Sequence, residues 1–217
     1  SYLVHGELWL VMEHMDGGTL RGVIDESQMS EDDIAAVSRE VRDPTCTSQG
    51  LGRIVWERGS EPEPFHVPGF VSVLLVCSDF GLSAQLSPEQ SRWSSVTGTP
   101  SWTAPEVMTG QPYGTKADIW CFGIVGIEMV DREVAYRNES PHSAQLLTAS
   151  EGIPQLQQPK LLSPLLRDFL SCCLQADEAR RCSAQELLQH QFVSSAKPAY
   201  SLVPLIISVK KGKEDTR

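Results

Sequence analysis

The sequence lacks three features that would place it at once in a class of protein. It contains no uninterrupted apolar run of about 18 residues, so no membrane span is expected. Basic residues are few: 18 Lys and Arg stand against 28 Asp and Glu, a formal net charge of −10. This argues against nucleic acid as a partner, because phosphate binding needs a basic surface. The first residues show neither the basic nor the apolar part of a signal peptide, so we expect a cytoplasmic protein.

Paired cysteine motifs are also missing. The chain has six cysteines, but no two of them form a C-x-x-C pair. The spacing therefore does not predict a zinc site. In a chain of this size without a signal peptide, we expect free, buried thiols. The cysteines are Cys46, Cys77, Cys121, Cys172, Cys173 and Cys182.

The chain does have enough apolar residues for one domain, with 41% hydrophobic content over 217 residues. Apolar runs around His5-Gly6-Glu7 predict a β-hairpin over residues 2–12. Further along, apolar periodicity and N-capping residues predict a mostly helical domain, and hence an α+β fold with a small β element in front. The helices are expected at 19–26, after Ser30 with Asp33 closing a capping box, at 105–109, from Thr115 to about Val130, after Ser140, after Ser163 and after Ser183.

One segment departs from this pattern. The helix that follows Ser30 is expected to stop at Asp43-Pro44, and residues 41–78 are rich in proline and glycine. Only Phe70–Cys77 has the composition of a strand, so we expect much of 42–68 to be loop. A long stretch of this kind is unusual within one domain.

Three motifs follow the anomalous segment. Asp79-Phe80-Gly81 comes first, and Ala104-Pro105-Glu106 follows, preceded by Gly98-Thr99-Pro100. Asp118-Ile119-Trp120, with Gly123 three residues later, then begins the apolar helix. A lone Asp-Phe-Gly is weak evidence, but the three motifs in this order and spacing form a strong signal.

Together these motifs resemble the C-terminal lobe of eukaryotic protein kinases, and more narrowly the PAK group of sterile-20-like serine/threonine kinases. The resemblance covers roughly residues 1–40 and 79–209. It implies a mostly helical kinase C-lobe, preceded by a short hairpin and the hinge of the N-lobe. Residues 210–217 form a charged tail, which we expect to fray because of its charge and its terminal position. Beyond the three motifs the resemblance rests on Ser1–Val4, Ile34–Val37, Ser87–Ser91, Gln185–Gln189 and Ala196–Pro198.

The resemblance implies a set of functional positions, with ATP and Mg²⁺ as cofactors and other kinase-pathway proteins as partners. Glu13 and Met15 match the hinge that bonds adenine, and Asp79 matches the Mg²⁺ ligand. Ser95 lies at the activation-loop phosphosite, and Thr99 with Pro100 matches the substrate-facing loop. The structural positions are Glu106 and Arg181, expected to pair, and Asp118, which caps the helix that holds the catalytic-loop backbone.

Simpler interpretations stay open for two of these positions. For Asp79 the simpler interpretation is a turn residue before Gly81, although its context favours the Asp-Phe-Gly motif as ancestry. Ser95 is one of several polar residues in its segment, beside Ser91, Ser94 and Thr97.

The chemistry that the resemblance implies is incomplete in this sequence. The family's catalytic loop is His-Arg-Asp, with Lys two residues and Asn five residues after the Asp. Here Arg42-Asp43 is followed by Pro44, and Thr45 and Ser48 occupy those two positions. The phosphate-binding Lys and the Gly-rich loop precede the hinge in the family, as does the GTPase-binding segment, and none is expected in this chain.

We therefore predict that this chain descends from a protein kinase but has no kinase activity. The alternatives are a pseudokinase-like binding module and a non-functional gene fragment in which 41–78 replaces a catalytic-loop exon. The replacement is expected to uncover apolar surface, to leave Asp118 unpaired and to lower stability.

Overall fold

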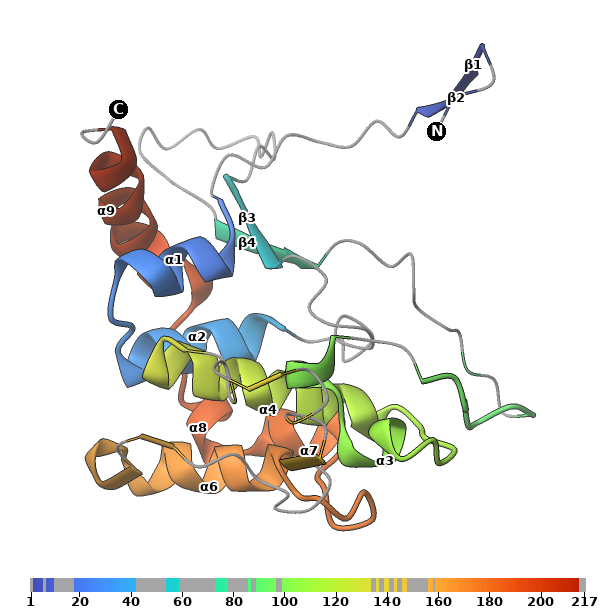
Figure 1. Cartoon of the computed structure of the whole chain (residues 1–217). Helices are drawn as coiled ribbons and strands as arrows, with labels where there is room; N and C mark the ends of the chain where they lie inside the picture. The colour runs from blue at the N-terminus through green and yellow to red at the C-terminus, as the bar shows by residue number, and fades with distance from the viewer. Residues whose placement is uncertain are drawn as a thin grey trace.

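A computed structural model describes residues 2–5, 7–9, 18–41, 54–58, 73–77, 86, 89–96, 99–133, 136, 139–140, 143, 146–147, 156–157 and 159–214. Over these residues the chain is mostly helical (Figure 1). The longer helices are α2 (Glu31–Glu40), α4 (Lys116–Asp131), α6 (Pro164–Cys173) and α9 (Val203–Glu214). The shorter ones are α1 (Leu20–Glu26), α3 (Pro105–Met108), α7 (Ala184–Gln189), α8 (Gln191–Ser194) and the 3₁₀ turns η2 (Pro100–Trp102), η3 (Pro159–Leu161) and η4 (Ala199–Leu202).

The N-caps expected from the sequence begin several of these helices. Ser30 accepts a hydrogen bond from the Asp33 backbone, and the Asp33 carboxylate accepts one from Ser30 N, which completes a capping box. Ser183 and Glu186 form a second box at α7, and Ser163 caps α6. These bonds satisfy backbone donors that a helix cannot satisfy itself. The helix expected after Ser140 lies largely outside the described residues.

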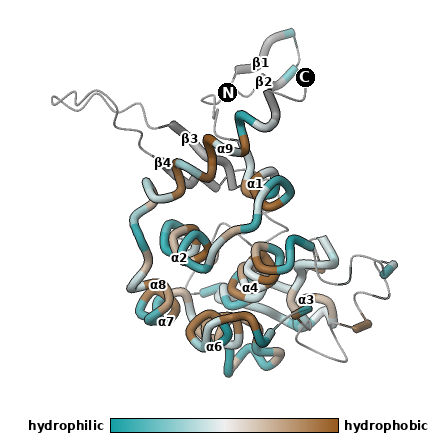
Figure 2. The backbone as a smooth tube through the Cα atoms, turned by 90° about the vertical axis from the view of Figure 1, so that its left-hand side faces the viewer, coloured by the Kyte–Doolittle hydropathy of each residue, from teal (hydrophilic) through white to brown (hydrophobic). Residues whose placement is uncertain are grey.

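Helix α4 is the centre of the core, and it is buried on all sides from Ala117 to Met129. It lies against α6 and η2, while α2 packs on α8 and η4 (Figure 1). Figure 2, which colours the backbone by hydropathy, shows α2, α4 and α6 grouped together. Among the described residues, no helix combines the length and the apolar character that crossing a bilayer requires.

Two glycines let α4 and α6 approach closely. A Cβ added at Gly123 would lie 2.7 Å from Leu174 Cγ and 2.8 Å from the Cβ of Cys173. A Cβ at Gly126 would lie 2.6 Å from Leu170 Cδ2. The helix–helix contact therefore depends on the absence of a side chain at these positions.

Among the described residues, four short strands form two antiparallel pairs. Strand β1 (Tyr2–Val4) pairs with β2 (Glu7–Trp9), with Tyr2 opposite Trp9. Strand β3 (Ile54–Arg58) pairs with β4 (Val73–Cys77), with Ile54 opposite Cys77. The second pair lies beside α1 and α2 (Figure 1).

Three expectations need correction. The segment 41–78 was expected to contain one strand, but Ile54-Val55-Trp56 are also β-formers and give β4 a partner for its backbone groups. The tail was expected to fray from Lys210, but α9 continues to Glu214. Of the thiols expected to be buried, Cys172 and Cys182 are partly exposed, because they lie where the chain leaves α6 and approaches α7 at the surface.

Candidate functional site

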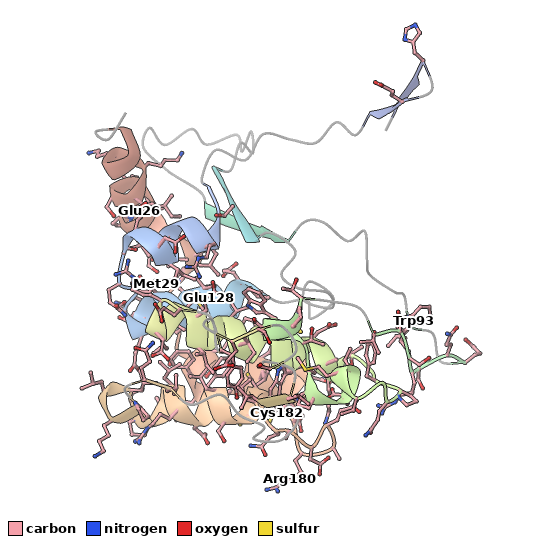
Figure 3. The ribbon with its side chains drawn as sticks, in the orientation of Figure 1. Glu26, Met29, Trp93, Glu128, Arg180 and Cys182 are labelled. Atoms are coloured by element: carbon pink, nitrogen blue, oxygen red, sulfur yellow. The ribbon has the colours of Figure 1, made fainter. Side chains whose placement is uncertain are left out.

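Residues 92–95, which precede η2, are bonded to the rest of the described chain at several points. Trp93 and Tyr113 form an antiparallel bridge, with both N–H···O distances at 2.8 Å. The Tyr113 hydroxyl donates to the Ser95 carbonyl at 2.9 Å. Figure 3 shows Trp93 on this segment, away from the centre of the helices. The side chain of Ser95 is exposed, so this predicted phosphosite position lies at the surface.

An ion pair fixes the same segment from outside. Arg92 Nη1 and Nη2 lie 2.7 Å and 2.8 Å from the two Glu178 carboxylate oxygens, a bidentate arrangement. Arg92 is half exposed, so solvent screens the attraction between the two charges. The bidentate pair therefore holds the segment in position but adds little to the free energy of unfolding.

Glu106 and Arg181, which were expected to pair, form a bidentate ion pair in the structure. Arg181 Nη1 and Nη2 donate to Glu106 at 2.7 Å and 2.9 Å. Arg181 also donates to two backbone carbonyls, from Nε to Gln175 and from Nη1 to Lys116. Its guanidinium carbon lies 5.3 Å from the centre of the Trp120 ring. The Arg181 side chain is fully buried, so these contacts replace the water that its charge would otherwise need.

Asp118 lies in the first turn of α4 and is buried, with 6% of its surface exposed. The expectation that it would be left without a partner is wrong. Burial raises the pKa of the Tyr113 hydroxyl, and the Asp118 charge raises it further. Nearby, Trp120 Nε1 is buried and has no hydrogen-bond partner among the described residues.

Glu128, on α4, is a buried charge that the sequence reasoning missed. Its carboxylate accepts from Arg21 Nη1 at 2.5 Å and from Trp102 Nε1 at 3.2 Å, so it links α4 to α1 and η2. Glu128 is labelled in Figure 3. A glutamate within the otherwise apolar run from Ile119 to Val130 was the available signal, because a buried carboxylate requires partners. Next to this contact, Thr99 is exposed at the start of η2, and its carbonyl accepts from the Thr103 hydroxyl at 2.9 Å.

The positions predicted to bind nucleotide and metal, Glu13, Met15 and Asp79, lie outside the described residues. Within the described part of the chain, Asp168, Cys172 and His190 bring possible ligand atoms within 4.8 Å of one another. This set does not suit Mg²⁺, which prefers oxygen ligands and no thiol. These side chains are therefore not a site for the Mg²⁺ of phosphoryl transfer.

Comparison with known proteins agrees with the motifs. A model of the protein kinase domain matches residues 72–193, more than half of the chain. This match begins seven residues before Asp79, inside the segment 41–78 that was expected to depart from the family, and it ends in α8.

Individual relatives extend the similarity over almost the whole chain. The serine/threonine-protein kinase PAK 1 of Mus musculus is 46% identical over 215 residues, which cover 99% of this chain and 39% of that protein. The serine/threonine-protein kinase pak-1 of Caenorhabditis elegans is 42% identical over 211 residues, covering 97% and 36%. The serine/threonine-protein kinase pakA of Talaromyces marneffei is 40% identical over 210 residues, covering 97% and 32%. The chain thus spans well under half the length of these relatives.

Proposed function

The chain belongs to the protein kinase family and is similar to its PAK group of serine/threonine kinases; from this premise we propose that it is a catalytically inactive member that binds protein partners. The observation that carries the proposal is a contrast within the chain. Residues 79–106 correspond to the activation segment of kinases, and Arg92, Trp93 and Glu106 of this segment each have a bonded partner in the rest of the chain. The catalytic-loop motif, in contrast, is absent from the sequence. The segment therefore retains the means to contact a protein, without the means to phosphorylate it.

The inactivity follows from the residues at the catalytic-loop position. Arg42-Asp43 is followed by Pro44, and Thr45 and Ser48 supply neither the lysine nor the metal-binding asparagine of the family pattern. A general base contributes about 10²–10⁴-fold to a reaction rate. Phosphoryl transfer also depends on positioned charges that stabilise the transferred group. Losing the base together with the metal ligand and the lysine leaves a negligible rate.

The binding role rests on how the segment is held. Trp93 is bonded to Tyr113 on one side, and Glu106 is bonded to Arg181 on the other. Between them Ser95, Val96 and Thr99 are exposed, and Val96 has 60% of its surface accessible. A surface held in place before binding loses less conformational entropy when a partner docks. The net charge of −10 favours a partner with a basic contact face.

The partner we propose is the catalytic domain of an active PAK-group kinase, and the regulatory position is Ser95. A phosphate on Ser95 adds negative charge to the exposed segment and strengthens its attraction to a basic face. The test is binding of the purified chain to such a kinase domain, measured by biolayer interferometry. Val96→Asp is expected to weaken binding at least tenfold. Tyr200→Asp, also 60% exposed but on η4, is the matched control and leaves binding unchanged.

The second candidate is an ATP-dependent serine/threonine kinase, which the retained Asp79-Phe80-Gly81 favours. Phosphate transfer from radiolabelled Mg-ATP to a basic serine peptide distinguishes the two. Transfer that Asp79→Asn abolishes supports the kinase. A chain that neither binds the kinase domain nor transfers phosphate, and that unfolds without a cooperative transition, supports a non-functional fragment.

A further inference from the structure

Four reactive side chains meet at the surface where α6 ends. They are Asp168 and Cys172 on α6, Cys182 before α7 and His190 at the start of α8; we call this group the thiol cluster. Asp168 Oδ2 lies 3.1 Å from His190 Nε2, and Cys172 brings its sulfur within 4.8 Å of both residues' ligand atoms. The Cys182 side chain also lies near Cys172 and raises the pKa of its thiol. Neither the kinase resemblance nor the proposed function uses these residues.

The backbone aligns the two cysteines of the cluster. Cys182 N donates to the Cys172 carbonyl at 3.1 Å. This single bond brings the backbone of Cys182 next to the last turn of α6, where Cys172 lies. A disulfide needs a Cα separation of about 4.4–6.8 Å, and the Cys182 side chain lies close enough to Cys172 to raise the pKa of its thiol. Bond formation between these sulfurs therefore requires little movement of the backbone.

The orientation of His190 argues against a metal at the cluster. Its Nδ1 accepts a hydrogen bond from Phe192 N at 3.1 Å and caps α8. A neutral ring with an accepting Nδ1 carries its proton on Nε2, and that nitrogen faces Asp168. Binding Zn²⁺ through Nε2 would move the proton to Nδ1, against the Phe192 N–H, and would cost the helix cap.

We propose that Cys172 and Cys182 form a reversible disulfide by exchange with a low-molecular-weight disulfide such as glutathione disulfide. One cysteine, as thiolate, attacks the glutathione disulfide, whose S–S bond breaks and releases one glutathione thiolate. The second cysteine then attacks the mixed disulfide and releases the other glutathione. The two cysteines lose two electrons and two protons, and the two glutathione molecules gain them as thiols.

The other described cysteines do not compete for this reaction. Cys121 and Cys173 are buried, whereas Cys172 and Cys182 are both partly exposed (Figure 3 labels Cys182). The bond would tie the end of α6 to the residue after Arg181, whose guanidinium holds Glu106. Oxidation would therefore restrain the loop before α7, which carries Arg181, the partner of Glu106.

The experiment incubates the whole folded chain in glutathione buffers of increasing oxidised fraction, followed by alkylation, digestion and mass spectrometry. We expect a Cys172–Cys182 peptide pair that dithiothreitol removes. The thermal midpoint of the oxidised protein should rise by about 5–10 °C. Cys182→Ser and Cys172→Ser should each abolish the pair and the rise, while Cys121→Ser should keep both.

Three results would overturn the proposal. The first is a cross-link that forms only in denaturant. The second is oxidation that joins either residue to Cys46 or Cys77 instead. The third is stoichiometric protection of both thiols by Zn²⁺ that His190→Ala removes, which would make the cluster a metal site.

Discussion

Arg181 and Glu106 lie 75 residues apart in the sequence and meet in a bidentate ion pair, with N–O distances of 2.7 Å and 2.9 Å. The pair joins the end of the activation segment to the loop before α7. Because the Arg181 side chain is fully buried and the Glu106 side chain 8% exposed, water screens the pair very little. Each charge depends on the other for its solvation.

Removal of one partner of this pair should be costly. Arg181→Met leaves the Glu106 carboxylate buried and unpaired, and we expect a loss of about 3–5 kcal/mol in the free energy of unfolding. Urea denaturation measures it. Arg92→Met is the control, because the Arg92–Glu178 pair is half exposed on the arginine side and should contribute less than about 1 kcal/mol. Equal losses in the two variants would contradict this account of burial.

The close approach of α4 and α6 gives a second prediction. In Gly123→Ala the new Cβ meets Leu174 and the Cβ of Cys173 at under 3 Å, so the helices must separate. We expect a net destabilisation of about 1–3 kcal/mol. Gly212→Ala on α9 is the matched control: nothing lies within 4 Å of its Cβ, and its helix propensity improves by up to about 1 kcal/mol. A stabilising Gly123→Ala would show that the contact is looser than described.

The hydrogen bonds of Glu186 predict that the stability of the protein depends on pH in the acid range. Hydrogen bonds from the Ser183 backbone and hydroxyl hold the pKa of Glu186 below its ordinary value. A carboxylate of this kind contributes stability above its unfolded pKa, and the contribution disappears as the pH falls through the folded pKa. The stability difference between wild type and Glu186→Gln should therefore be present at pH 7 and vanish in acid. NMR titration should show that Ser183→Ala raises the pKa of Glu186 toward its ordinary value.

The raised pKa of the Cys172 thiol predicts that its rate of alkylation increases with pH. Burial raises its pKa to about 11, helped by the hydrogen bond to Cys182 and the charges of Asp168 and Glu186. Because only the thiolate reacts, alkylation of Cys172 by iodoacetamide should accelerate about tenfold per pH unit from pH 7 to 10. Peptide-resolved mass spectrometry measures the rate at this cysteine alone. A rate that levels off near pH 8 would contradict the raised pKa.

The sequence predicted helices best where local chemistry decides them. Ser30, Ser163 and Ser183 each begin a helix as expected, because capping bonds involve residues only a few positions apart. The apolar helix after Thr115 is likewise confirmed by α4.

Contacts between distant residues were harder to predict. The pairing of Glu106 with Arg181 was implied by the family resemblance and by no local pattern. The partners of Glu128, Arg21 and Trp102, and the proximity of Cys172 to Cys182 depend on how the helices pack. The helical extent of the tail was missed because its charged residues suggested fraying, while α9 continues through them.

The central claim is that a protein of kinase ancestry has kept the support of its activation segment and lost phosphoryl transfer. The most direct measurement is incorporation of radiolabelled phosphate from Mg-ATP into a basic serine peptide, with wild type and Asp79→Asn purified in parallel. We predict the same background incorporation for both proteins. Incorporation by the wild type that rises with protein concentration and is abolished in Asp79→Asn would contradict the claim.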